Sequence, residues 1–200
     1  MSLIDRTEYL KTSYLVRHLN YFDRECIVEQ LKVTSESSFS FKALERRANI
    51  LRDLGEKTVC TPKLFAWFAR EGYWHLIYEA IEGTSLEAEL NANISEITEQ
   101  EAKALLKEIL EILAAIHQCN IVHRQISPNN LIRRDRDRKL ALVDFEIAKY
   151  IDTDNSFFFS PQHQINISYA APEFITDPAF STDLYSVGKI IIFALTKLTP

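Results

Sequence analysis

The stretch HRQISPNNL, residues 123–131, decides the fold assignment of this chain. It is a polar segment between two short apolar pairs, Ile121–Val122 and Leu131–Ile132, which predicts a loop joining two short strands. A second polar loop begins at Asp144, directly after the apolar run Leu140–Val143. The candidate chemistry of the C-terminal part is therefore expected in these two loops.

The residues before this region predict a small β-rich part. β-Formers predict two strands near Ser13–Val16 and Cys26–Leu31. Apolar residues at helical spacing predict a helix over residues 38–54, with Gly55 as its stop. Two further strands are expected at Lys63–Phe68 and Trp74–Tyr78.

The remainder of the chain predicts helices. Residues 98–118 carry an apolar stripe and begin with a capping-box pattern, Thr98 with Glu101. A mostly apolar helix is expected over residues 181–198. The layout predicts an α+β fold with a strand-rich lobe, residues 1–82, and a helix-rich lobe, residues 83–200.

Composition narrows the function classes. The formal net charge of −5 argues against nucleic acid as a partner, because phosphate backbones attract basic surfaces. No apolar run approaches the ~18 residues of a membrane-spanning helix. The three cysteines have no metal-ligand spacing, and the charged N-terminus does not resemble a signal peptide, so we expect a reduced, cytoplasmic chain.

Four motifs in sequence order resemble those of eukaryotic-type serine/threonine protein kinases, bacterial branch. Residues 123–131 resemble the catalytic loop, and Asp144-Phe145-Glu146 resembles the Asp-Phe-Gly metal loop. Ala171-Pro172-Glu173 matches a third motif, and residues 183–188 are similar to the start of the central helix of the large lobe. The resemblance implies a bilobal kinase-like fold whose large lobe lacks its last helices in this chain.

The resemblance also shows which catalytic groups differ. The family's loop Asp accepts the proton of the substrate hydroxyl, and Gln125 stands in its place. A neutral amide cannot serve as general base. The lysine that often follows two residues later is Ser127. We therefore expect a catalytically impaired, pseudokinase-like member.

The phosphate-binding pair of the small lobe is expected to be inverted. Alignment with the family places Glu29 at the strand lysine and Arg47 at the helix glutamate that pairs with it. A carboxylate at that point would repel phosphates. The alternative is a register error, in which Glu45 or Glu29 is merely solvated.

Other nucleotide contacts are also altered. The segment that should hold the glycine-rich loop, residues 5–12, contains no glycine, and its amides could not approach phosphates closely. Tyr78 stands where the family places the residue guarding the back of the nucleotide pocket. The resemblance makes residues 79–81 the hinge, with Glu79 and Ile81 as candidate adenine contacts through their backbone.

Asn130 and Asp144 occupy the two metal-ligand positions of the family, and oxygen ligands of this kind suit magnesium. Glu146 replaces the glycine of that loop. Two interpretations stay open: a divalent ion with weakly held ATP, or residues that only bond within the loop. We expect no tightly bound cofactor.

Two further features have an ordinary structural explanation as well as a functional one. In the family, the counterpart of Arg124 can bind a phosphorylated activation loop, and acceptors follow at Thr153, Ser156, Ser160 and Ser168. The basic run of residues 133–139 is expected to cover a solvated turn.

Three functions remain in competition on the sequence. The favoured one is a binding or regulatory scaffold with a protein partner. The alternatives are a serine/threonine kinase with residual or atypical phosphotransfer, and a non-functional remnant.

Overall fold

A computed structural model describes residues 11–18, 24–32, 38–92, 96–151, 166–174 and 176–198. The chain divides into two compact units, Met1–Ile81 and Glu82–Pro200, with the division one residue before the expected lobe boundary. Residues 5–10 of the expected glycine-loop segment lie outside the described residues, as do Thr153, Ser156 and Ser160.

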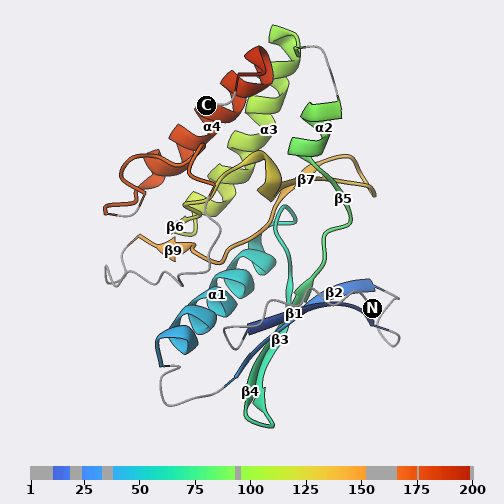
Figure 1. Cartoon of the computed structure of the whole chain (residues 1–200), viewed down its shortest axis with the longest axis vertical. Helices are drawn as coiled ribbons and strands as arrows, with labels where there is room; N and C mark the ends of the chain where they lie inside the picture. Colours follow the sequence, from blue (N-terminus) through green and yellow to red (C-terminus); the bar gives the residue numbers. More distant parts are fainter. Residues whose placement is uncertain are drawn as a thin grey trace. The chain divides into compact units, whose positions relative to one another are not determined.

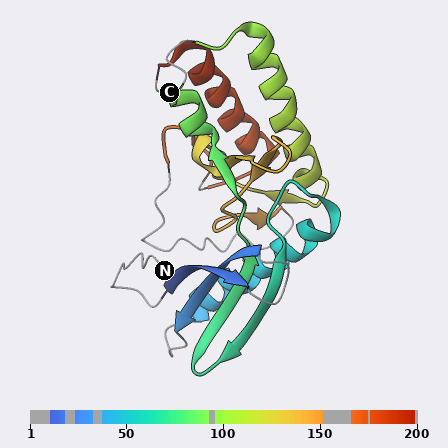
Figure 2. The ribbon, with the colours of Figure 1, turned by 90° about the vertical axis from the view of Figure 1, so that its right-hand side faces the viewer.

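The N-terminal unit is an antiparallel sheet with one helix beside it (Figures 1 and 2). Its strand order is β1-β2-β4-β3. The elements are β1 (Lys11–His18), β2 (Arg24–Lys32), α1 (Ser38–Lys57), β3 (Leu64–Arg70) and β4 (Tyr73–Glu79). All four strands and the helix were predicted, but α1 continues through Gly55 to Lys57, so its predicted end at residue 54 was wrong by three residues.

One face of the sheet packs against α1. Because side chains alternate along each strand, every second residue of a strand lies on that face. Glu29 of β2 lies opposite Leu76 of β4, and Ile27 lies opposite Tyr78. Leu76 and Tyr78 are buried, as are Leu44, Ala48, Leu51 and Leu54 of α1. At the start of α1, Phe41 packs on Trp74 with ring centroids 4.7 Å apart, and Trp74 stacks on Trp67 at 5.2 Å.

The C-terminal unit is helical with short paired strands. Its elements are β5 (Gly83–Ser85), α2 (Leu86–Ala92), α3 (Glu99–His117), β6 (Ile121–Val122), a 3-10 turn η1 (Pro128–Asn130), β7 (Leu131–Arg134), β8 (Leu140–Leu142), β9 (Lys149–Tyr150) and α4 (Phe180–Thr196). The strands form a sheet β5-β7-β8 and a pair β6-β9. Helices α3 and α4 lie side by side (Figures 1 and 2).

The capping box at the start of α3 is present as the sequence indicated. The Thr98 hydroxyl accepts the Glu101 amide, and the Glu101 carboxylate accepts the Thr98 amide at 2.8 Å. Residues Leu105, Ile109, Ile112, Leu113 and Ile116 of the predicted stripe are all buried. None of the described helices has the length and apolar character needed to cross a membrane.

Candidate functional site

Glu29 and Arg47 approach each other from β2 and α1 in the interior of the N-terminal unit. Glu29 is on the strand face that packs against the helix, and Arg47 follows Leu44 by three residues on the buried side of α1. Only 4% of Glu29 and 5% of Arg47 are exposed. Charged residues are rarely so deeply buried unless they are paired, so their surroundings must satisfy both charges.

The two side chains form a bidentate ion pair. Arg47 Nη1 donates to Glu29 Oε2 at 2.7 Å, and Arg47 Nη2 donates to Glu29 Oε1 at 2.8 Å. Two parallel N–H···O bonds are the preferred geometry of arginine with a carboxylate. The pairing predicted from the sequence is therefore present, and the alternative of a solvated Glu29 is wrong. The role of the pair in binding a cofactor stays a prediction.

Tyr78 of β4 completes this arrangement. Its hydroxyl donates to Glu29 Oε1 at 2.6 Å and accepts from Arg47 Nη2 at 2.8 Å. From the sequence, Tyr78 was expected only to guard the back of the nucleotide pocket. Strand alternation puts Tyr78 on the same face as Leu76. The contact of its hydroxyl with Glu29 depends on the register between β2 and β4, so it could not be predicted from the sequence.

The two candidate hinge residues lie at the end of β4. The Glu79 amide donates to the Lys63 carbonyl at 2.9 Å, and the Lys63 amide donates to Glu79 Oε2 at 3.3 Å. The Ala80 amide donates to the Glu25 carbonyl at 3.2 Å. Ile81 follows and is half-buried. These bonds tie the segment to β2 and to the residue before β3, and its adenine contacts stay a prediction.

In the C-terminal unit, the carboxylate of Asp183 organises the loop after β6. Asp183 lies in the first turn of α4 and is fully buried. Its Oδ2 accepts the His123 amide at 2.9 Å, and its Oδ1 accepts the Arg124 amide at 2.8 Å. His117 Nε2 of α3 lies 2.9 Å from Oδ2. One side chain thus joins α3, α4 and the loop that carries Gln125.

His123 is held as a neutral ring. It is completely buried, its Nε2 lies 3.0 Å from the Val143 carbonyl, and its Nδ1 accepts the Gln125 amide at 3.3 Å. A ring that donates from Nε2 and accepts at Nδ1 is the neutral form. Burial lowers the pKa of His123 from 6.5, against the opposing charges of Asp183 and Asp144. The ring of His123 meets that of Phe145 edge-on, with centroids 4.8 Å apart, so the two side chains pack on each other.

Gln125 and Asn130 are joined through the backbone. Asn130 Nδ2 donates to the Gln125 carbonyl at 2.9 Å, and the Asn130 carbonyl accepts the Val143 amide at 2.9 Å. These bonds fix the loop before β7 beside the segment after β8. Because Nδ2 is used in this way, Oδ1 is the atom of Asn130 suited to accept a hydrogen bond or coordinate a cation. The side chain of Gln125 is an amide, so it cannot act as a general base.

Asp144 has a left-handed backbone conformation, with φ of 63°, as does Arg124, with φ of 71°. Such values are uncommon for residues other than glycine and often occur at functional sites. Asp144 Oδ1 accepts the Glu146 amide at a long 3.4 Å. The Asp144 carboxylate and Asn130 Oδ1 have the oxygen chemistry of a magnesium site, in which one or two carboxylates act together with substrate phosphates. The binding of a magnesium ion by these two residues stays a prediction.

The Arg124 side chain is buried and hydrogen-bonded within the C-terminal unit. It is 4% exposed, and its guanidinium donates to the Phe174 carbonyl at 3.1 Å and to the Ile147 carbonyl at 3.2 Å. It therefore links the segments after Phe145 and around Phe174. The predicted contact with a phosphorylated loop would require these bonds to rearrange.

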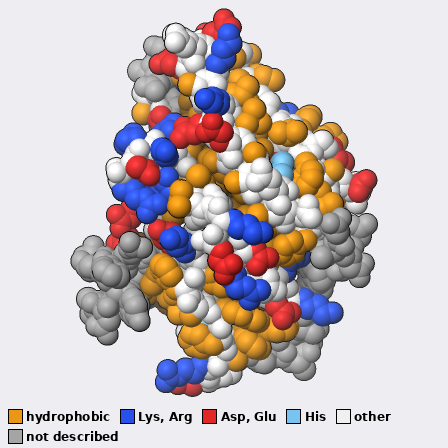
Figure 3. Space-filling view, turned by 180° about the vertical axis from the view of Figure 1, so that it is seen from behind, with side chains coloured by type: hydrophobic (Ala, Val, Ile, Leu, Met, Phe, Trp, Pro, Cys, Tyr) orange, Lys and Arg blue, Asp and Glu red, His pale blue; other side chains and the backbone are white. Residues whose placement is uncertain are grey.

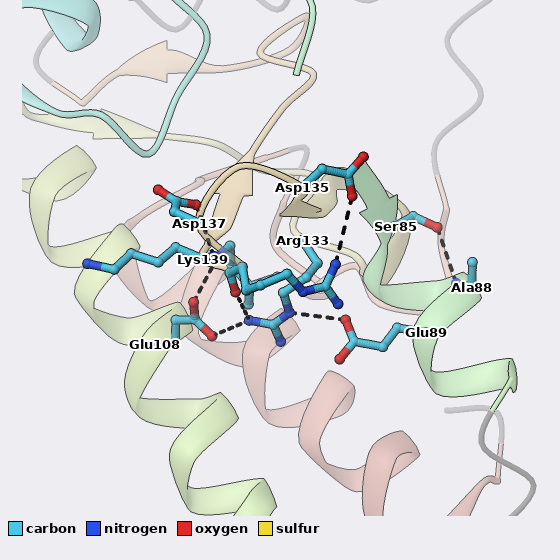
Figure 4. A network of polar contacts seen from close by, with 10 residues as sticks. Ser85, Ala88, Glu89, Glu108, Arg133, Asp135, Asp137 and Lys139 are labelled. Atoms are coloured by element: carbon cyan, nitrogen blue, oxygen red, sulfur yellow. Dashed lines mark hydrogen bonds and ion pairs between the residues drawn. The ribbon is translucent and has the colours of Figure 1, made fainter. Parts of the chain in front are cut away.

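The basic run at residues 133–139 differs from the prediction of a solvated turn. Arg133 lies between two helices, with Nε 3.1 Å from Glu89 of α2 and Nη1 2.7 Å from Glu108 of α3 (Figure 4). Burial alone would lower the pKa of Arg133, but its bonds to Glu108 and Glu89 outweigh burial and raise it. Arg134 is 2% exposed and pairs with Asp137 at 2.9 Å. The expectation was wrong for these two residues because β7 carries them inward.

Comparison with known proteins identifies the family. Residues 20–200 match the protein kinase domain. Serine/threonine-protein kinase D of Synechocystis sp. is 35% identical over 166 residues, covering 80% of this chain and 32% of that protein. Serine/threonine-protein kinase C of the same organism is 33% identical over 186 residues, covering 88% and 35%. Serine/threonine-protein kinase PknA of Nostoc sp. is 31% identical over 187 residues, covering 89% and 33%.

The chain belongs to the protein kinase domain family, and its relatives include bacterial serine/threonine kinases. This confirms the predicted family and the α+β kinase-like fold. The chain spans about a third of the length of these curated relatives.

Proposed function

We propose that this chain is a kinase-like domain that does not transfer phosphate and acts as a binding or regulatory module for a protein partner. The observation that carries the proposal is the buried ion pair in which Glu29 lies on β2 and Arg47 on α1. Protein kinases place lysine on the strand and glutamate on the helix.

The exchange of the two charges changes the sign of the electrostatic interaction between the strand residue and a phosphate. At about 4 Å and an effective dielectric near 20, a unit charge contributes roughly 4 kcal/mol of attraction or repulsion. A carboxylate in place of an ammonium therefore replaces attraction with repulsion of similar size. Arg47 does not compensate directly, because two of its nitrogens already donate to Glu29 at 2.7 and 2.8 Å.

Gln125 adds an independent reason. General-base catalysis contributes ~10²–10⁴-fold to a rate, and an amide cannot supply it. The loss of the base alone would leave a slow enzyme. Together with the inverted pair, it favours a domain that neither holds ATP well nor activates a substrate hydroxyl.

The second candidate is a serine/threonine kinase with residual phosphotransfer. It is favoured by Asn130, whose amide nitrogen bonds to the Gln125 carbonyl at 2.9 Å and so makes Oδ1 the atom suited to a cation. It is also favoured by the relatives, which are named serine/threonine-protein kinases. A magnesium ion bound by Asn130 and Asp144 would supply charge neutralisation for a phosphate.

Thermal unfolding of the purified chain with magnesium or manganese, with and without ATP, separates these functions. A ligand that binds only the folded state at about 100 times its Kd stabilises it by ~2.7 kcal/mol, which is a readily measured rise in Tm. We expect cooperative unfolding and no rise in Tm with metal and ATP.

The control is Asp144→Asn, which removes a candidate metal ligand. A metal-dependent ATP shift in the wild type that Asp144→Asn abolishes, together with phosphate transfer to a peptide library, would overturn the proposal in favour of a residual kinase. Non-cooperative unfolding of the wild type would instead support a non-functional remnant.

A further inference from the structure

The buried ion pair of the N-terminal unit includes a third member that the kinase resemblance does not supply. Tyr78 is 7% exposed, and its hydroxyl lies 2.6 Å from Glu29 Oε1 and 2.8 Å from Arg47 Nη2. The three side chains come from three different elements: β2, β4 and α1. We define Glu29, Arg47 and Tyr78 as the buried triad.

The geometry gives each atom of the triad a distinct role. Arg47 Nη2 carries two protons, and its two acceptors are Glu29 Oε1 and the Tyr78 oxygen. The hydroxyl proton is directed to Glu29 Oε1, which accepts from both partners. The hydroxyl therefore acts as donor to the negative group and acceptor to the positive one, which an aliphatic or phenylalanine side chain could not do.

We propose that Tyr78 is a positioning residue that fixes the inverted ion pair and thereby holds α1 on the sheet through contacts within the chain. Buried charges are costly unless additional hydrogen bonds satisfy them. Bonds to charged groups are among the stronger ones in proteins. The docking of α1 is thus set by β2 and β4 themselves. This inference does not depend on whether the chain transfers phosphate.

Tyr78→Phe tests the role of the hydroxyl because it keeps the ring and removes one oxygen. Hydrogen–deuterium exchange of the full chain should show roughly tenfold or greater acceleration for amides of α1. The matched control is Tyr73→Phe, which removes a hydroxyl from an exposed tyrosine at the start of the same strand and should leave exchange in α1 unchanged.

A second measurement reports on Arg47 itself. In ¹⁵N-arginine spectra, a guanidinium held by Glu29 and Tyr78 should give separate, slowly exchanging Nη proton signals, and Tyr78→Phe should broaden or merge them. A residue that merely filled space would not change these signals when its ring is retained.

The background Glu29→Leu/Arg47→Met, in which the pair is replaced by apolar groups, completes the test. If Tyr78 acts through the pair, Tyr78→Phe should accelerate exchange in α1 much less in this background than in the wild type. Equal acceleration in both backgrounds, or unchanged exchange and Arg47 signals in the single variant, would overturn the proposal. If the background does not fold, the Arg47 signals and the Tyr73 control still decide it.

Discussion

Replacing one partner of the buried pair should destabilise the N-terminal unit far more than replacing both. Glu29→Leu leaves the Arg47 guanidinium in a site where only 5% of the residue is exposed, and Arg47→Met leaves the Glu29 carboxylate at 4% exposure. Removing one partner of a buried ion pair typically costs about 3–5 kcal/mol, because the remaining charge is desolvated and has lost its ionic partner. The double replacement by apolar residues of similar volume is often close to neutral.

The positions of the tryptophans make the assay specific. The chain has two tryptophans, and both are in the N-terminal unit. Trp67 and Trp74 stack at 5.2 Å beside Phe41 of α1, so their fluorescence reports the packing of the helix on the sheet. Urea titrations followed by this signal should show each single variant less stable by about 3–5 kcal/mol. The double variant should lose only about 1–3 kcal/mol, because the buried Tyr78 hydroxyl loses its bonds to both removed groups.

The matched control is Arg52→Met, also on α1. Arg52 is exposed and lies 3.8 Å from Asp53, and exposed pairs of this kind contribute ~0–1 kcal/mol. The reasoning would be refuted if either single variant of the buried pair lost less than about 1 kcal/mol, or if the two losses simply added in the double variant.

Two further predictions concern the C-terminal unit. Gly83→Ala should reduce stability by roughly 2–4 kcal/mol, because a Cβ there would lie 2.2 Å from the Arg133 carbonyl oxygen and the backbone φ is +156°. The control is Gly188→Ala, since a Cβ at Gly188 would have no heavy atom within 4 Å. Urea unfolding midpoints, followed by circular dichroism, measure the stability of both variants. Stability should also fall as pH decreases below about 6.5, because burial lowers the pKa of His123 in the folded chain and the unfolded chain then binds more protons. The dependence should approach 1.36 kcal/mol per pH unit and flatten in His123→Gln, and an equal slope in that variant would contradict the assignment.

The longer elements could be predicted because their own residues determine them. The apolar stripe of α3 and its Thr98–Glu101 cap are local signals, and both are present. The missed elements depend on distant partners: β5 exists by pairing Gly83 with Arg134, and β9 by pairing Tyr150 with Ile121. Helix α2 has seven residues, with only Leu86 and Leu90 buried, which is too short for a clear period.

The candidate site shows the same division between local and distant determinants. The inverted charges could be predicted because the family motif assigns sign to each position. The burial of Arg133 could not, because it depends on Glu89 and Glu108 arriving from two helices. On the face that Figure 3 shows, hydrophobic side chains lie among charged ones. The type of a residue therefore does not by itself decide whether its side chain is exposed to solvent.

The inverted pair also shows how the fold can be kept when the charge that β2 presents to a phosphate is exchanged. The attraction between two opposite charges is the same when the charges exchange places, so Glu29 with Arg47 ties β2 to α1 as a lysine with a glutamate would. A ligand phosphate is attracted or repelled according to the sign of the group on the strand, so the exchange of charges changes its interaction energy. Tyr78 is suited to the inverted arrangement, since its hydroxyl donates to the carboxylate on β2 at 2.6 Å, whereas an ammonium there would have no lone pair to accept that proton. Three positions on three elements therefore agree with one another, which is what a site adapted to the exchanged charges requires.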